Sequence, residues 1–334
     1  MTRSLKRATA SRDVAEAIDE IAAAFETLPQ YRVRRWPSKL FARRPGIRGT
    51  ETEISAGIDD VSGELVVAVK TRSPTFRYRA GNPTALSFLN RNHLSAALTT
   101  GGRSVYACAR FPFGPDSCMR DEMVPLVISS VLTGEAGYIA SLTAIAHGLN
   151  TGAPSAWSPK AMKKLGAFYQ EFPDYEFKKN EFRFSIPSQH RPSQHFAAVN
   201  VTTNPPHLAA GGGLRVQTFL APIFPQFAAE VAAGILNRME AEGSAGVGIP
   251  HYGAWFAFKG TLLYHTFLVN ELKSVAPAFV RMMPSFHGQR AMWAEDMLKT
   301  REFSRLLAEE TTLALERNDI DPEDLLMPEE VAEH

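Results

Sequence analysis

The chain has 334 residues, 45% of them hydrophobic, and a formal net charge of only +1. This near neutrality argues against a dedicated nucleic-acid-binding protein, because such domains usually carry a strong basic excess. The apolar runs fall short of the roughly 18 to 20 residues that span a bilayer, and the N-terminus lacks the apolar core of a signal peptide. The composition therefore predicts a globular protein of the cytoplasm with no membrane segment.

The first half of the chain begins with an amphipathic helix, because its apolar residues recur at helical spacing. Asn82 and Pro83 suit the N-cap and first position of a second helix, which the glycines at 101 and 102 would end. The predicted elements are a helix, a basic aromatic stretch, two strands, the second helix, a strand and a third helix, at residues 13–28, 31–41, 51–58, 64–71, 83–100, 103–113 and 121–132.

The second half repeats this order of elements after a linker over residues 148–159. Lys259 and Gly260 occupy the expected turn of a hairpin, and Pro277 is expected to kink the helix that contains it. The predicted elements are a helix, three strands, a helix, the two hairpin strands and two further helices, at residues 158–172, 181–186, 195–202, 214–220, 225–239, 251–258, 261–267, 269–283 and 287–318.

The two halves also share residues at a fixed spacing. With a shift of 147 residues and no gap, nine of the 43 positions from Val69 to Phe111 are identical in the second half. Such self-similarity predicts an internal duplication. We therefore expect an α+β fold of two tandem units, each an antiparallel sheet packed by helices, related by a pseudo-twofold axis. The units would cover residues 1–152 and 158–318, and an acidic tail would follow over 319–334.

Charge is unevenly distributed along the chain. Residues 1–48 hold eleven Lys or Arg against five acids, whereas residues 316–334 hold eight acids against one Arg. A basic head and an acidic tail could meet, within one chain or between chains, although such charge commonly means only a solvated surface. The basic stretch could grip an acidic partner or single-stranded nucleic acid, or simply be a basic edge strand that resists pairing. Its candidate partner-binding residues are Arg34, Arg35, Trp36, Arg43 and Arg44.

A short motif repeats on the middle helix of each half. The first half has Leu-Asn-Arg-Asn at 89–92, with Leu86 three residues before it, and the second half has Leu236-Asn237. With the order of elements, this motif resembles the type III secretion chaperone-like fold, and within it the YbjN-like proteins labelled bacterial sensory transduction regulators. The length of the chain, its second copy and its acidic tail depart from that family. The resemblance implies a non-enzymatic, dimer-forming scaffold that binds protein or peptide.

The sequence contains no motif that names a reaction. It lacks a phosphate-binding loop, a His-Glu-x-x-His zinc motif and a Gly-x-Ser-x-Gly nucleophile elbow. No catalytic residue, cofactor or metal is therefore predicted. The clustered histidines His190, His195 and His207 have no acid among them, and Cys108 and Cys118 do not have metal-ligand spacing. Cys108 lies in a strand pattern and is expected to be a small core residue.

Two further groups of residues are candidate sites. Strand alternation places His251 and Trp255 on one face of the predicted hairpin, where with Tyr264 and His265 they could line a ligand pocket. The alternative is that these side chains only cover a neighbouring helix. The repeated motif residues are expected to be structural, with each asparagine satisfying backbone groups at a helix end or adopting a left-handed conformation. They are Asn90, Arg91, Asn237 and Arg238.

These patterns favour a non-enzymatic, cytoplasmic protein-binding or chaperone-like adaptor that holds a protein or peptide on an exposed sheet or helix surface. One alternative is a small-molecule sensor or enzyme with a pocket near His251, Trp255 and His265. A second alternative is a nucleic-acid-associated regulator that uses the basic N-terminal region. The chain is expected to be a monomer with an internal pseudo-dimer, or a homodimer. A deep closed pocket would favour the sensor, and an exposed groove would favour the adaptor.

Overall fold

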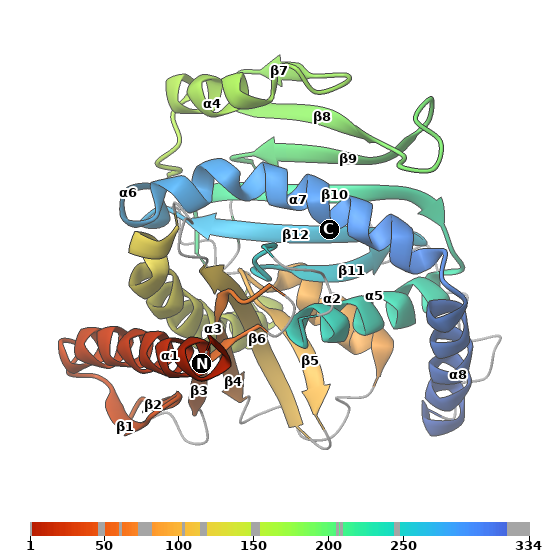
Figure 1. The fold of residues 1–334 in the computed structure, drawn as a ribbon. Coiled ribbons are helices and arrows are strands. Elements are labelled where there is room, and N and C mark those ends of the chain that lie inside the picture. Colours follow the sequence, from red (N-terminus) through yellow and green to blue (C-terminus); the bar gives the residue numbers. More distant parts are fainter. Residues whose placement is uncertain are drawn as a thin grey trace.

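The computed structural model describes residues 2–45, 51–59, 62–72, 82–101, 104–113, 119–147, 154–204, 207, 210–243 and 248–318. It has a mixed α+β fold with two six-stranded antiparallel sheets, each packed by helices (Figure 1). This confirms the predicted fold class of two similar units. No helix in these ranges is both long enough and apolar enough to cross a membrane. Cys118 and the acidic segment 319–334 lie outside the described residues.

The first sheet has the strand order β1-β2-β3-β4-β6-β5. A four-stranded meander is followed by a helix and then by a hairpin that returns to pair with β4. In chain order the elements are α1 (Thr2–Glu26), β1 (Arg32–Trp36), β2 (Lys39–Arg43), β3 (Thr52–Ile58), β4 (Leu65–Arg72), α2 (Pro83–Asn92), β5 (Ala97–Gly101), β6 (Ser104–Phe113), the 3₁₀ turn η1 (Arg120–Glu122) and α3 (Met123–His147).

The second sheet has the order β7-β8-β9-β10-β12-β11, which is the same topology. Its edge hairpin turns at Lys259 and Gly260, both with positive φ, as predicted. The elements are α4 (Pro159–Gly166), η2 (Ala167–Tyr169), β7 (Glu176–Lys178), β8 (Glu181–Pro187), β9 (His195–Thr202), β10 (Gly213–Ile223), α5 (Gln226–Ala241), β11 (Ala254–Phe258), β12 (Thr261–Val269), α6 (Leu272–Val275), α7 (Pro277–Leu298) and α8 (Arg301–Asn318).

Strand register shows which residues of the two copies are equivalent. Ile54 pairs with Val69 in the first sheet, and Val201 pairs with Val216 in the second, which gives the predicted shift of 147 residues. After the middle helix the shift is 157, because Leu98 pairs with Ala107 and Trp255 pairs with Tyr264. The stretch from Asn237 to Trp255 is therefore ten residues longer than the equivalent stretch from Asn90 to Leu98.

This longer segment corrects the ungapped alignment. Ala107 and Phe111 lie in β6, whereas Ala254 and Phe258, with which they were matched, lie in β11. Two of the nine identities therefore join strands that are not equivalent, and a third matches Gly101 of β5 with Gly248, which lies outside the strands. The other six, from Val69/Val216 to Arg91/Arg238, lie in equivalent strands and helices. The duplication is real, but its spacing changes once along this stretch.

Other sequence expectations need correction at helix ends. The second helix ends at Asn92 rather than at the glycines, and residues 97–101 form strand β5. Pro277 does not kink a helix but begins α7. Proline is suited to the first helical position, because it lacks a backbone N–H and an N–H at that position has no partner within the helix. The short strand β7 was not predicted, since three residues are too few to show an alternating pattern.

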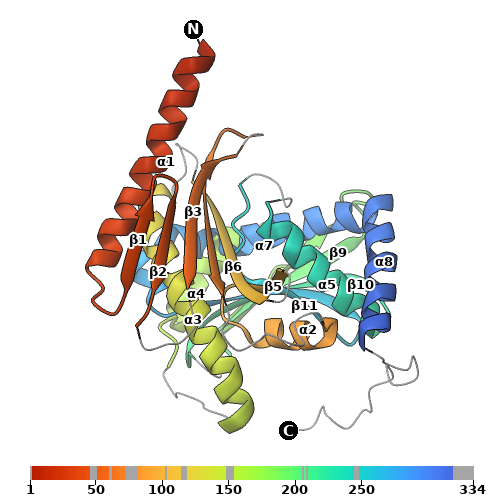
Figure 2. The same ribbon diagram turned by 90° about the horizontal axis from the view of Figure 1, so that it is seen from below.

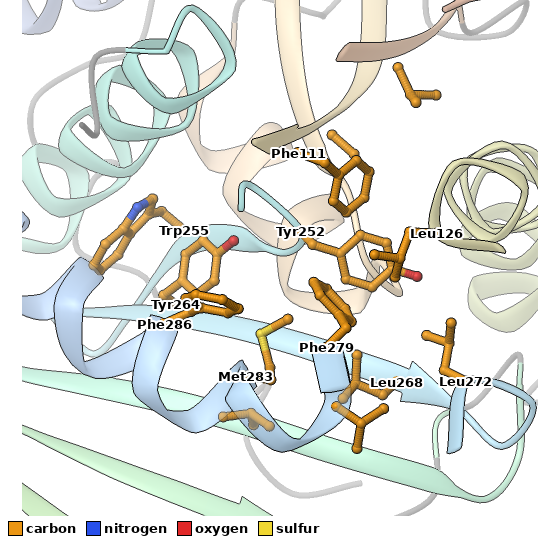
Figure 3. Packing of buried hydrophobic residues seen from close by; sticks show 14 of the residues in the cluster. Phe111, Leu126, Tyr252, Trp255, Tyr264, Leu268, Leu272, Phe279, Met283 and Phe286 are labelled. Carbon is orange, nitrogen blue, oxygen red and sulfur yellow. The ribbon is translucent and has the colours of Figure 1, made fainter. Parts of the chain in front are cut away.

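Helices α1 and α3 pack on one face of the first sheet, and α4 and α7 pack on one face of the second. Helices α2 and α5 lie between the copies and contact each other, as Figure 1 shows. Most buried apolar side chains of both copies form one continuous cluster. In Figure 3, Tyr252 joins the two copies: its ring lies 5.6 Å from that of Phe111 on β6 and 5.2 Å from that of Phe279 on α7.

Backbone hydrogen bonds cross between the two sheets in a pseudo-symmetric way. The Phe267 N–H of β12 donates to the Leu94 carbonyl, 2.8 Å away, just before β5. At the equivalent place, Arg110 of β6 exchanges two backbone hydrogen bonds with His251, just before β11. The segment that precedes each edge strand thus pairs with the other sheet. Each sheet is completed by the opposite copy, as in a twofold dimer.

Candidate functional site

The first sheet has one face that α1 and α3 do not cover. Strand alternation directs Leu40, Ile54 and Val69 towards the helices, and the residues between them point to the opposite side, here called the open face. The open face carries seven basic and three aromatic side chains, and three acidic side chains form ion pairs with three of the basic ones. They are Arg32, Arg34, Lys39, Arg43, Lys70, Arg72 and Arg110; Trp36, Phe41 and Tyr106; and Glu51, Glu53 and Asp59.

The acids neutralise only part of this charge. Lys39 lies 2.6 Å from Glu53, Arg34 lies 2.8 Å from Glu51, and Arg110 lies 3.2 Å from Asp59. Arg43 and Arg72 are exposed and have no ion-pair partner among the described residues. Because the side chains come from five neighbouring strands, the face presents a broad positive field rather than isolated charges.

The aromatic side chains of the open face are engaged locally. Trp36 and Phe41 meet edge to face with ring centroids 5.0 Å apart, and the Lys70 ammonium lies 4.2 Å from the Tyr106 ring centroid. A ring that is covered in this way offers less free surface for stacking with a nucleobase. Trp36 still has 47% of its surface exposed, so it can contribute apolar contact area to a partner.

A groove of about 170 Å³ lies where the open face meets the C-terminal end of α5. Lys70 and Glu53 line one side, Thr99 and Cys108 lie across β5 and β6, and Arg238 comes from the helix. The Arg238 guanidinium is held by Glu310 of α8. Burial raises the pKa of the Cys108 thiol, so this cysteine stays protonated and is not an activated nucleophile.

The structure divides the five predicted partner-binding residues. Arg34, Trp36 and Arg43 lie on the open face. Arg35 points to the other side and forms an ion pair with Asp19 of α1. Arg44 lies near the buried Glu135, whose pKa is raised by burial and lowered in part by that arginine. The predicted basic edge strand is β1 itself, which is the outermost strand of the sheet.

The predicted ligand residues lie in a closed interior. His251, Trp255, Tyr264 and His265 are between 0 and 3% exposed. His251 Nδ1 lies 2.6 Å from a Glu240 carboxylate oxygen, and Trp255 Nε1 donates to the other oxygen at 2.7 Å. Strand β11 begins only at Ala254, so His251 precedes the hairpin strand in which it was predicted, and it meets Trp255 at the Glu240 carboxylate. Ligand binding by the four residues stays a prediction.

Glu240 and Arg290 are the two charged residues of this interior that sequence reasoning missed. Arg290 Nε lies 2.8 Å from each Glu240 oxygen, its NH2 group donates to the Pro250 carbonyl at 2.5 Å, and its guanidinium lies 3.9 Å from the Tyr264 ring centroid. Burial tends to raise the pKa of Glu240, but Arg290 and His251 outweigh it and the pKa is lowered. We call Glu240, His251, Trp255 and Arg290 the charged cluster.

The contacts of the charged cluster hold a segment of the fold in place. Both carboxylate oxygens of Glu240 are occupied by protein donors and the group is excluded from water, so it cannot take a proton from a substrate as the structure stands. The cluster holds Pro250 and His251, the segment that crosses to pair with Arg110. The sequence did not indicate that Glu240 and Arg290 form a buried ion pair, because each lies in an ordinary helical pattern.

The repeated asparagines make equivalent hydrogen bonds in both copies. Asn90 accepts from the Leu98 N–H at 2.7 Å and donates to the Leu98 carbonyl at 3.2 Å. Asn237 makes the same pair of bonds with Trp255, at 2.7 and 2.9 Å. Each asparagine side chain thus bonds both the N–H and the carbonyl of one residue in the edge strand, as the backbone of a neighbouring strand would. The alternative of a left-handed asparagine is wrong, since neither residue has positive φ.

The repeated arginines differ in their partners. Arg91 lies over the Phe258 ring, 4.4 Å from its centroid, whereas Arg238 pairs with Glu310. The three histidines that cluster in the sequence also separate, since His190 contacts Asp296, His195 contacts Asp174 and His207 contacts the Asn92 carbonyl.

A second buried group lies where α2 packs on the second sheet. His265 Nε2 lies 2.7 Å from the Asn90 carbonyl oxygen, and His207 Nε2 lies 2.9 Å from that of Asn92. Burial lowers the pKa of His93 and of His265 to about 3, and that of His207 to about 4. We call these three residues the histidine layer. It is uncharged at neutral pH.

Comparison with known proteins gives no match to a family model, a curated protein or a solved structure. The resemblance to the type III secretion chaperone-like fold therefore stays a prediction.

Proposed function

We propose that this protein is a non-enzymatic cytoplasmic adaptor that holds an acidic segment of a partner protein on the open face of its first sheet. The observation that supports the proposal is the gathering of seven basic side chains on that face, of which only three are paired with acidic ones. Complementary charge of this kind steers encounter and excludes basic partners.

Two observations favour an acidic protein segment over single-stranded nucleic acid. The aromatic rings of the open face already contact each other or Lys70, so few ring faces are free to stack with bases. The net charge of the whole chain is also only +1, whereas nucleic-acid-binding proteins draw much of their affinity from a large excess of cations.

The experiment measures binding of a fluorescent peptide rich in Glu and Asp by anisotropy, with single-stranded oligo-dT of similar charge as the second probe. The test variant is Arg43→Glu with Arg72→Glu, because both side chains are exposed on the open face. The matched control is Lys178→Glu with Arg183→Glu, which changes the same number of charges on the corresponding face of the second sheet.

We expect the open-face variant to lose at least about tenfold in peptide affinity, which is about 1.4 kcal/mol, and the control to stay within about twofold. Equal losses in both variants would mean that only bulk charge matters and would contradict the proposal. Tighter binding of oligo-dT than of the peptide would also overturn it, in favour of the nucleic-acid-associated alternative.

A further inference from the structure

The two copies leave different outer edges to their sheets. The inner edges, β5 and β11, lie near each other between the copies (Figure 2), and each is continued by a segment that pairs with the other sheet. The outer edges are β1 and β7, and no described segment pairs with either of them on its free side. An unpaired edge can accept an added strand unless its length or charge prevents it.

The edge at β7 is poorly suited to an added strand. It has only three residues, and its charges are paired with those of β8, since Glu176 lies 2.7 Å from Arg183 and Lys178 lies 3.8 Å from Glu181. A short, electrically balanced edge offers few backbone groups and selects no partner by charge.

The edge at β1 has five residues, and four of the five are exposed. Three of them are arginines: Arg32 and Arg34 on the open face and Arg35 on the side of α1. Arg32 and Arg34 lie beside an added strand on one face, and Arg35 lies beside it on the other. Like charges on facing strands repel, so two copies of this edge disfavour each other, whereas an acidic strand is attracted.

Hairpin geometry identifies the free backbone groups of this edge. Trp36 pairs with Lys39 across a two-residue turn, and the residues that flank such a turn form a hydrogen-bonded pair. Alternation then makes Arg34 and Arg32 further members of hydrogen-bonded pairs with β2, so the backbone groups of Val33 and Arg35 point away from the sheet. An incoming strand would bond to these two residues.

From this edge we infer that the acidic partner segment binds in an extended conformation as a seventh strand beside β1. Its backbone pairs with Val33 and Arg35, and alternate acidic side chains lie against Arg32 and Arg34. This inference rests on the proposed function and adds the mode of binding. The 47% exposed Trp36 at the end of β1 would contact the same segment.

The test compares Arg35→Pro with Arg35→Ala in binding of the acidic peptide. Both variants remove the guanidinium and its ion pair with Asp19, but only proline removes the outward N–H. Proline is tolerated in an edge strand when its N–H faces solvent. We expect Arg35→Pro to weaken binding at least about fivefold relative to Arg35→Ala, with melting temperatures within a few degrees of each other. Equal affinities of the two folded variants would overturn the inference.

A second measurement uses the unmodified protein and does not depend on the folding of either variant. Hydrogen exchange followed by NMR reports on each backbone amide of β1 with and without the peptide. We expect slower exchange at Val33 and Arg35 and no change at the exposed amides of β7. A peptide that binds without protecting these two amides would overturn strand addition and leave the proposed function standing. A peptide that does not bind at all would overturn the proposed function itself.

The other occupants of the edge give distinct results. Dimerisation that depends on Arg35 in sedimentation experiments without peptide would show that a second copy occupies β1, and would overturn the inference. Deletion of residues 319–334 tests the acidic segment of the chain itself. Protection of Val33 and Arg35 in the absence of peptide that disappears with this deletion would assign the edge to that segment and overturn the partner-binding inference.

Discussion

The faces of the two sheets that point away from their main covering helices can be compared position by position. At six equivalent places the first sheet has a basic residue and the second does not. The pairs are Arg34 and Glu176, Lys39 and Glu181, Arg43 and Ser185, Lys70 and Gln217, Arg72 and Phe219, and Arg110 and Phe267.

The opposite faces, which point towards the helices, have changed less. Val69 and Val216 are equivalent and buried, as are Thr71 and Thr218, although Lys70 and Gln217 between them differ. Core positions are constrained by packing, whereas an exposed face can change charge without a cost to the fold. The comparison teaches that the duplication kept one scaffold and gave the two copies different surfaces.

A change of pH tests the histidine layer between the two copies and should have the largest effect on the free energy of unfolding. The histidines His93, His207 and His265 have pKa values of about 3 to 4 in the folded chain, below the ordinary value of 6.5. As the pH falls below about 6.5 the unfolded chain binds protons that the folded chain does not, so the free energy of unfolding falls. Each histidine contributes up to about 1.4 kcal/mol per pH unit, and the three together up to about 4.

Denaturant unfolding at pH values between 7 and 4.5 checks this expectation, with His93→Gln as the test variant. His287 is also buried, and burial lowers its pKa as well, so four histidines contribute to the slope. The variant should therefore reduce the slope of the free energy of unfolding against pH by about a quarter, because one of four proton-binding groups is removed. A free energy of unfolding that is constant over this range would show that the histidine layer does not stay uncharged in the folded chain.

Removal of Glu240 tests the corresponding place in the second copy, since Glu240 and His93 occupy equivalent positions. Glu240→Ala leaves Arg290 buried without its carboxylate, so we expect the free energy of unfolding to fall by about 3 to 5 kcal/mol. Glu242→Ala, two residues away and exposed, should change it by less than about 0.5 kcal/mol. Similar losses in the two variants would mean that the charged cluster adds no special stability.

The two asparagines provide a symmetric test. Asn90→Ala and Asn237→Ala each remove two buried hydrogen bonds to the edge strand, so each should cost about 2 to 3 kcal/mol in the free energy of unfolding. Asn92→Ala is the control, because its side chain makes only an exposed bond to the Phe88 carbonyl. A large difference between Asn90→Ala and Asn237→Ala would show that the two copies do not contribute equally to the joint.

The smallest effect is expected on the open face. Arg43→Glu with Arg72→Glu should change the free energy of unfolding by no more than about 0.5 kcal/mol, since both side chains are exposed and unpaired by acids in the described structure. Thermal unfolding of this variant beside the unmodified chain measures the difference. A loss of several kcal/mol would show that the basic residues support the fold rather than binding.

Sequence patterns were sufficient for much of the fold. Strand patterns were recognised at 51–58 and 64–71, close to the bounds of β3 and β4, Asn82 and Pro83 marked the start of α2, and Lys259-Gly260 marked a hairpin turn. These features are local, because a strand, a helix start or a tight turn depends on residues close together in the chain. The repeat of Leu89-Asn90-Arg91 likewise revealed the duplication before any contact was known.

How these elements meet depends on contacts between distant parts of the chain. The gathering of Arg34, Lys70 and Arg72 on one face needs the order of the strands in the sheet, which local patterns do not contain. The contact of Glu240 with Arg290 joins residues 50 positions apart. The change of shift from 147 to 157 residues depends on hydrogen-bond register. Local patterns suffice for the elements and their repetition, whereas strand order, register and the burial of charge depend on packing between distant segments.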